Sequence, residues 1–204
     1  MHDIADIATI TTSFSSTFYG GYRDVIEVSG TAWEAAVCEL PKTIVGKLEA
    51  TIVKNIDKNH FKYVFDCFDM MGREMGSIHK DVFTKKHTLR KCLQDSRNIV
   101  VINKLIVEPA FRGTGIGTNL LYDFIEMVCP YASAVVLKPY PIHVPRKKYV
   151  PQKEIDRLIN FYLTLGFKRI LGTTKMYFLP DYAGFMENLR TASGVKGDWI
   201  WWSC

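Results

Sequence analysis

A nine-residue apolar run that leads through a glycine-rich loop into an amphipathic segment constrains the fold of this chain more than any other feature. Residues 99–107, IVVINKLIV, are mostly β-branched and apolar, which predicts a strand buried on both faces in the middle of a sheet. Pro109 ends this run. Beyond the loop, apolar side chains recur at helical spacing, and these are Leu120, Leu121, Phe124, Ile125 and Val128. The predicted unit is therefore strand, glycine loop and helix.

Further elements of both kinds follow this unit. Residues 134–137 predict a second buried strand, and residues 152–165 predict a helix that Gly166 caps. Residues 167–170 and 175–179 predict two short strands. The predicted fold class is therefore mixed α/β, or α+β, with helices that flank a central sheet.

The N-terminal half of the chain has less regular patterns. Residues 25–28 and 43–48 predict short strands, whereas residues 33–40 fit a helix as an alternative. Residues 60–68 alternate and are rich in aromatic side chains, which predicts a strand. Residues 70–83 contain two glycines and remain ambiguous.

The expected organisation is one domain with two flanking segments. Residues 1–20 are rich in Ser, Thr and small side chains, and we expect a poorly ordered segment or an edge element there. Residues 21–180 form the single expected domain. Residues 181–204 form a C-terminal extension that ends in a tryptophan-rich run, either a contact surface or a segment packed back on the domain.

Composition excludes several classes of protein. With 48% hydrophobic and 23% charged residues, the 204-residue chain has an ordinary globular balance. Its net charge of +5 suits an anionic small molecule or an acidic surface, but does not by itself indicate nucleic acid. Five scattered cysteines without a C-x-x-C pair predict reduced thiols and no zinc knuckle. The start of the chain does not look like a signal peptide, so we expect a cytoplasmic protein that does not span a membrane.

The strand–loop–helix unit is suited to binding a phosphate group. Glycines let backbone amides approach a ligand closely, and a helix N-terminus supplies unpaired N–H groups and a positive dipole. The spacing excludes two common nucleotide motifs, because no Lys-Ser or Lys-Thr pair follows Gly117 as in a P-loop. Glycines at 113, 115 and 117 also fail the dinucleotide pattern G-x-G-x-x-G. Without a ligand, the same glycines would form only a tight turn.

Two motifs resemble the GNAT superfamily of N-acetyltransferases. Residues 107–117 fill each fixed position of the pattern V-x-P-x-x-[QR]-x-x-G-x-[GA], and residues 161–167, FYLTLGF, resemble the family segment F-Y-x-x-L-G-F. The resemblance covers about residues 99–180. It implies a mostly antiparallel sheet that splits between the two strands around the loop, and acetyl-CoA as the co-substrate.

The resemblance also implies a set of cofactor-binding residues. Backbone groups at the end of the preceding strand would hold the thioester and the pantetheine arm, and the matching positions are Leu105, Ile106 and Val107. Backbone amides of the loop would hold the pyrophosphate, and Arg112 fills the Gln/Arg position that opens the loop. The amide positions are Gly113, Thr114, Gly115, Ile116, Gly117 and Thr118.

Tyr162 is the catalytic residue that the resemblance implies, as the proton donor to the departing CoA thiolate. The alternative is a core tyrosine on the apolar stripe of its helix. The base that deprotonates the amine stays open: Val150 and Ile155 stand where relatives often carry polar residues, and His143 and Glu108 are weak candidates. The expected reaction is direct transfer of an acetyl group to a primary amine in a ternary complex. A non-catalytic CoA-binding module and a different acyl-CoA are the alternatives.

The remaining polar features have two interpretations each. Asn103 and Lys104 either face the thioester or mark a bulge or sheet edge. Basic residues within 80–97 favour a solvated helical face over a patch for an acidic substrate, whereas those of 146–148 and Lys138 fit solvated charge or a site for the 3′-phosphate of CoA. We expect no metal site, a small-molecule or peptide amine as the partner, no nucleic acid, and leave a homodimer open.

Overall fold

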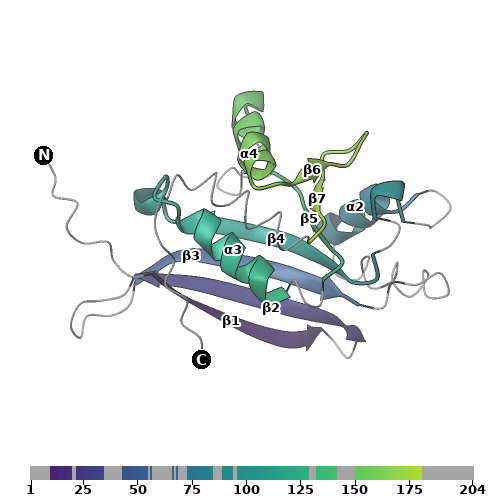
Figure 1. The fold of residues 1–204 in the computed structure, drawn as a ribbon, viewed down its shortest axis with the longest axis horizontal. Helices are drawn as coiled ribbons and strands as arrows, with labels where there is room; N and C mark the ends of the chain where they lie inside the picture. Colours follow the sequence, from purple (N-terminus) through teal and green to yellow (C-terminus); the bar gives the residue numbers. More distant parts are fainter. Residues whose placement is uncertain are drawn as a thin grey trace, which may run out of the picture.

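The computed structural model describes a seven-stranded sheet with helices on both faces (Figure 1). It describes residues 10–19, 22–34, 43–54, 56, 66, 68, 73–84, 89–93, 96–128, 132–141 and 150–180. The strands are β1 (Ile10–Tyr19), β2 (Tyr22–Glu34), β3 (Thr43–Val53), β4 (Ile99–Val107), β5 (Ala134–Leu137), β6 (Lys168–Arg169) and β7 (Met176–Phe178). The helices are α2 (Arg73–Val82), α3 (Ile116–Val128) and α4 (Gln152–Thr164), with short 3-10 turns η1 (Lys91–Leu93) and η2 (Pro109–Phe111).

The sheet is antiparallel except at one seam. Its order is β1-β2-β3-β4-β5-β7-β6, and only β4 and β5 run parallel among the described strands. A parallel pair needs a crossover connection, which α3 provides. The predicted fold class, a mixed and mostly antiparallel sheet with a parallel pair around the glycine loop, is confirmed.

Alternate residues of the two central strands enter two different cores. Val100 and Ile102 of β4 pack in a cluster with α3, whereas Ile99 and Val101 pack in a second cluster with α2. In Figure 1, α3 lies across one face of the long strands, and α2 lies near the end at which β4 begins. Because both faces are covered there, β5 and the first half of β4 are apolar throughout, as the sequence predicts.

The helix and strand predictions for residues 99–180 are confirmed with small changes at the ends. The apolar side chains of α3, which include Leu120, Leu121 and Phe124, are buried, and Gly166 follows α4 with a positive φ of 87°. A glycine accepts this left-handed conformation at little cost and so ends the helix. The short strands β6 and β7 pair around Gly172, whose φ is 74°.

Upstream, two interpretations are corrected. Trp33 and Glu34 belong to β2, so the helical alternative is wrong there. Asp66 and Phe68 are helical, so the strand predicted over 60–68 is wrong at these positions, and its other residues lie outside the described ones. Phe68 is fully buried with its ring 5.7 Å from that of His79, so tertiary packing outweighs the local alternation.

The basic stretch 80–97 does not form one helical face. Helix α2 ends at Val82, and Phe83 then forms an isolated bridge with Leu89. Lys80, Lys91 and Arg97 are exposed, as a solvated charge would be. No described helix is both long and apolar enough to cross a membrane.

Candidate acetyl-CoA site at the split of the sheet

The two parallel strands separate in the middle of β4. Pairing between β4 and β5 runs only from Ile99 to Ile102, while β3 continues to pair with β4 as far as Val107. Residues 99–102 are buried, whereas residues 103–107 are half-buried or exposed. On the β5 side, the second half of β4 therefore has no strand partner within the described chain, and its backbone groups there can bind a ligand. The predicted positions Leu105, Ile106 and Val107 lie on this stretch.

A bulge at Asn103 marks the point of separation. Ala50 of β3 is opposite Ile102 and Glu49 is opposite Lys104, so Asn103 is the extra residue. Asn103 Nδ2 donates a 2.8 Å hydrogen bond to Thr51 Oγ1, and Lys104 Nζ lies 3.0 Å from Glu49 Oε1. The interpretation of Asn103 and Lys104 as a bulge is therefore confirmed.

The segment after β4 is held by local hydrogen bonds. The Glu108 amide donates to the Val45 carbonyl at 2.9 Å, which continues the contact with β3. Arg112 Nε donates to the Val107 carbonyl at 3.1 Å, and Thr114 Oγ1 donates to the Phe111 carbonyl at 2.7 Å. These side chains therefore fix the turn between β4 and α3.

Glycine is required at the three loop positions for two different structural reasons. Gly113 and Gly115 have φ of 82° and 89°, a left-handed conformation that other residues rarely adopt. Gly117 instead allows close packing, because a Cβ there would lie 3.2 Å from Val107 Cγ2. The glycine pattern thus both shapes the turn and sets the first turn of α3 against the end of β4.

Six consecutive backbone amides in this loop donate no hydrogen bond to another described residue. They are the predicted amides of Gly113, Thr114, Gly115, Ile116, Gly117 and Thr118, and the first amide with a partner is that of Asn119, which donates to the Gly115 carbonyl at 3.0 Å. Free N–H groups at a helix N-terminus, with the dipole behind them, attract an anion. The arrangement fits a pyrophosphate.

Tyr162 lies in the large core cluster beneath α3, and the partly buried Leu105 and Val107 pack against this cluster. Its side chain is 8% exposed, and burial raises its pKa to about 12. Its ring centroid lies 5.1 Å from that of Phe161 and 5.6 Å from that of Phe167, both edge-on. Both interpretations of Tyr162 are therefore compatible with the packing, because a protonated phenol in the core can also donate a proton.

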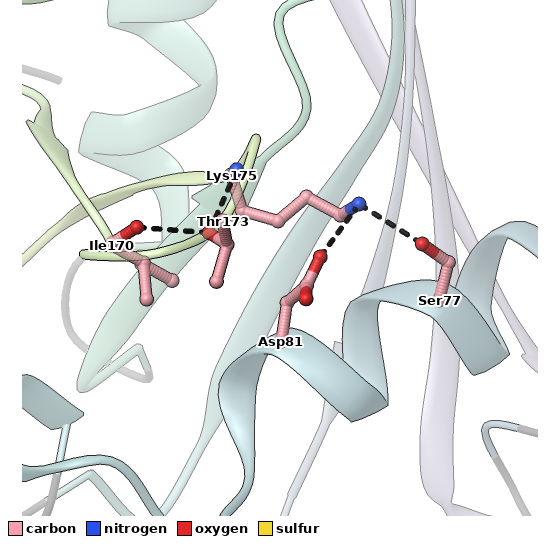
Figure 2. A network of polar contacts seen from close by, with 5 residues as sticks. All are labelled: Ser77, Asp81, Ile170, Thr173 and Lys175. Carbon is pink, nitrogen blue, oxygen red and sulfur yellow. Dashed lines mark hydrogen bonds and ion pairs between the residues drawn. The ribbon is translucent and has the colours of Figure 1, made fainter.

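A buried lysine ties the hairpin after α4 to α2 (Figure 2). The side chain of Lys175 is only 2% exposed, and its Nζ lies 3.1 Å from Asp81 Oδ2 and donates to Ser77 Oγ at 3.0 Å. At the other end of the residue, the Lys175 amide donates to Thr173 Oγ1, which donates to the Ile170 carbonyl. This network anchors the β6–β7 turn, and neither Lys175 nor Glu49 was singled out from the sequence.

The other sequence candidates are scattered. Glu108 and Lys138 are exposed, and Lys138 Nζ lies 5.1 Å from the ring centroid of Tyr140. His143 and the basic run 146–148 lie outside the described residues. In the part of the chain that the structure describes, no three His, Cys, Asp or Glu side chains form a group that could hold a metal ion.

Comparison with known proteins finds similarity at the level of fold. No family model and no curated protein matches this chain. The structure of NAA60 from Arabidopsis thaliana with acetyl-CoA is 15% identical, with a TM-score of 0.42 over 75% of this chain and 76% of that one. The polyamine N-acetyltransferase of Drosophila melanogaster is 13% identical, with a TM-score of 0.39 over 74% of each chain. A KacTA–DNA complex is 9% identical, with a TM-score of 0.45 over 92% of this chain and 100% of that one.

Proposed function

We propose that this chain is an acetyl-CoA-dependent N-acetyltransferase that moves an acetyl group directly to a primary amine in a ternary complex. One observation carries the proposal: the second half of β4, which pairs with β3 but with no described strand on the β5 side, leads directly into six backbone amides at the start of α3 that have no partner among the described residues. Together with the two GNAT-like motifs, this continuous row of backbone groups matches a ligand with an amide-containing arm and a pyrophosphate.

Each predicted binding residue has a specific role in this proposal. The stretch that contains Leu105, Ile106 and Val107 pairs with the pantetheine arm on the side where no described strand lies, and the amides of residues 113–118 hold the pyrophosphate. The guanidinium of Arg112 holds the Val107 carbonyl and adds positive charge at the loop. A Cβ at position 117 would lie 3.2 Å from Val107 Cγ2, so the glycine lets the loop pack against the strand without displacing the Val107 side chain.

Tyr162 protonates the leaving thiolate in this proposal. Transfer requires an uncharged amine, whose lone pair attacks the thioester carbonyl, and a proton for the departing sulfur. With a pKa of about 12, the phenol is protonated at neutral pH and is available as a donor. The hydrophobic packing around the ring fixes its position.

A charge placed at the start of α3 tests the binding site. Thr118→Glu puts a carboxylate in the first turn, where it stabilises a helix through the dipole but repels a pyrophosphate. We expect the affinity for acetyl-CoA, measured by calorimetry, to fall about tenfold or more relative to Thr118→Gln, which has nearly the same shape without the charge. The melting temperature of the ligand-free Glu variant should not fall below that of the Gln variant.

Two results would contradict this proposal. Wild-type protein whose melting temperature does not respond to millimolar acetyl-CoA would exclude the binding site. Acetyl-CoA binding without thiol release in the presence of n-propylamine, spermidine and a peptide with a free lysine would favour a non-catalytic CoA-binding module. Release only from another acyl-CoA would change the acyl group and keep the reaction class.

A further inference from the structure

The bulge in β4 gathers polar side chains on the face of the sheet opposite α3. Thr51 of β3 is paired with Val101, which belongs to the core beneath α2. Glu49 stands two residues before Thr51 and so shares its face, because strand side chains alternate. Asn103 and Lys104 both reach this face, since one bonds to Thr51 and the other to Glu49.

The carboxylate of Glu49 lies beside the stretch of β4 where the acetyl group is proposed to bind. Its ion pair with Lys104 stands next to Leu105, the first of the three predicted thioester-binding positions. The side chains of Lys104 and Glu49 are 33% and 49% exposed, so solvent and a substrate can reach the pair. Within the described chain, Lys104 is the one residue that bonds to this carboxylate, which leaves Oε2 for another donor.

Tyr162 and Glu49 belong to opposite faces of the sheet. Tyr162 packs in the cluster beneath α3 with Leu105 and Val107, whereas the Glu49–Lys104 pair is on the other face. The donor that protonates the sulfur and the base that deprotonates the amine act on different atoms and therefore need separate positions. The split between β4 and β5 beyond Ile102 leaves room for a substrate between these two positions in this proposal.

We propose that Glu49 is the catalytic base of the acetyl transfer and binds the acceptor as an ammonium ion, an inference that rests on the proposed function. The acceptor ammonium shares the carboxylate with Lys104 and gives it one proton. The free amine attacks the carbonyl carbon, a C–N bond forms and the C–S bond breaks. The thiolate takes the proton of Tyr162, the second proton released by nitrogen restores the phenol through water, and Glu49 returns its proton to solvent.

Other carboxylates of the described chain are less suitable. Glu108 lies beyond the end of β4, where its amide bonds to Val45 and leads into the loop. Glu27 is exposed on the same face as Glu49 but on β2, opposite Thr51 and two strands away from β4. Glu27 is therefore a matched control, because it has the same charge, exposure and strand environment without the contact with β4.

The test compares Glu49→Gln with Glu27→Gln on the fastest of the three amines named above. We expect Glu49→Gln to lower kcat/KM about 100-fold, with acetyl-CoA affinity and melting temperature unchanged, and Glu27→Gln to remain near wild type. The pH profile supplies a second readout. Without a base, log kcat/KM should rise with unit slope up to the pKa of the free amine, whereas the wild type should reach its plateau at lower pH.

The outcomes separate this inference from the proposed function. If Glu49→Gln keeps the wild-type rate and profile while acetyl-CoA is still consumed, Glu49 is not the base, and the acetyltransferase proposal stands. If Glu49→Gln and Glu27→Gln lose activity equally, the loss reflects the change in surface charge, and Glu49 is not the catalytic base. If wild-type protein binds acetyl-CoA but acetylates none of the three amines, both the proposed reaction and this inference fail.

Discussion

Tyr162 keeps its phenol proton at neutral pH and well above it. Burial disfavours the charged phenolate and raises the pKa of Tyr162 from 10 to about 12. The rings of Phe161 and Phe167 pack edge-on against it and leave little freedom for the side chain. Such a residue is present as the neutral phenol at neutral pH, so it can donate a hydrogen bond to a developing thiolate and is unsuited to accept a proton.

Replacing Tyr162 with Phe should therefore remove a proton donor without disturbing the fold. We expect kcat to fall about 100-fold and the affinity for acetyl-CoA to stay within about twofold. Because the wild-type pKa is about 12, the loss should be the same at pH 6 and at pH 9, with no inflection from this residue between them. Tyr177→Phe is the control, because Tyr177 of β7 packs against the core beneath α2 and not against the core that contains Tyr162. Full turnover by Tyr162→Phe would show that Tyr162 is only a core residue and not the proton donor.

At the scale of elements, the short hairpin β6–β7 depends on contacts outside its own strands. The ladder of β7 with β5 has only three residue pairs, and β6 adds two more to β7. Lys175 bonds to Asp81 and Ser77 of α2, and Arg90 Nη1 donates to the Leu171 carbonyl at 3.1 Å. The hairpin leads from α4, so these contacts help to hold the helix that carries Tyr162.

The two partners of the buried ion pair should not be equivalent. Asp81→Asn leaves an ammonium that is 2% exposed without its counter-charge, and we expect a loss of about 3 kcal/mol in the free energy of unfolding. Lys175→Met leaves Asp81, which is 26% exposed and can be hydrated, so the loss should be nearer about 1 kcal/mol. Urea unfolding measures both, with Lys80→Met as the exposed control on the same helix. A larger loss for Lys175→Met than for Asp81→Asn would show that the unpaired buried ammonium is not the main cost.

Sequence periodicity predicts the elements of residues 99–180 well because their patterns are local. The apolar run of β4, the stripe of α3 and the cap at Gly166 depend on neighbouring residues only. The pairing of Lys104 with Glu49 is different, since it depends on the register between strands 55 residues apart. Lys175 likewise meets Ser77 from 98 residues away, and the sequence offers no period that links them.

At the scale of the whole molecule, the sheet consists of two unequal parts joined by one short ladder. The four longer strands β1 to β4 form one antiparallel array, and β5, β7 and β6 form the other. Four residue pairs between β4 and β5 connect them within the sheet. A ligand that pairs with β4 beyond Ile102 would therefore extend the connection between the two parts.

Hydrogen exchange can detect this effect across the molecule. We expect acetyl-CoA to slow amide exchange in residues 103–118 and to leave residues 25–33 of β2 unchanged, because β2 is paired on both sides without a ligand. Mass spectrometry of peptides from both regions makes the comparison within one sample. Uniform protection of both regions would indicate general stabilisation and not a ligand in the split.

The bulge at Asn103 places two consecutive side chains, those of Asn103 and Lys104, on the same face of the sheet. Deleting this one residue would restore regular alternation and keep Leu105 and Val107 toward the core beneath α3, but it would remove the hydrogen-bond partner of Thr51. Chains descended from a common ancestor could therefore exchange Lys104 or Glu49 and acquire new acceptors by single substitutions. Loss of the extra residue would likewise alter only this polar face, so in inherited forms of the site the acceptor face can change while the core beneath α3 stays the same.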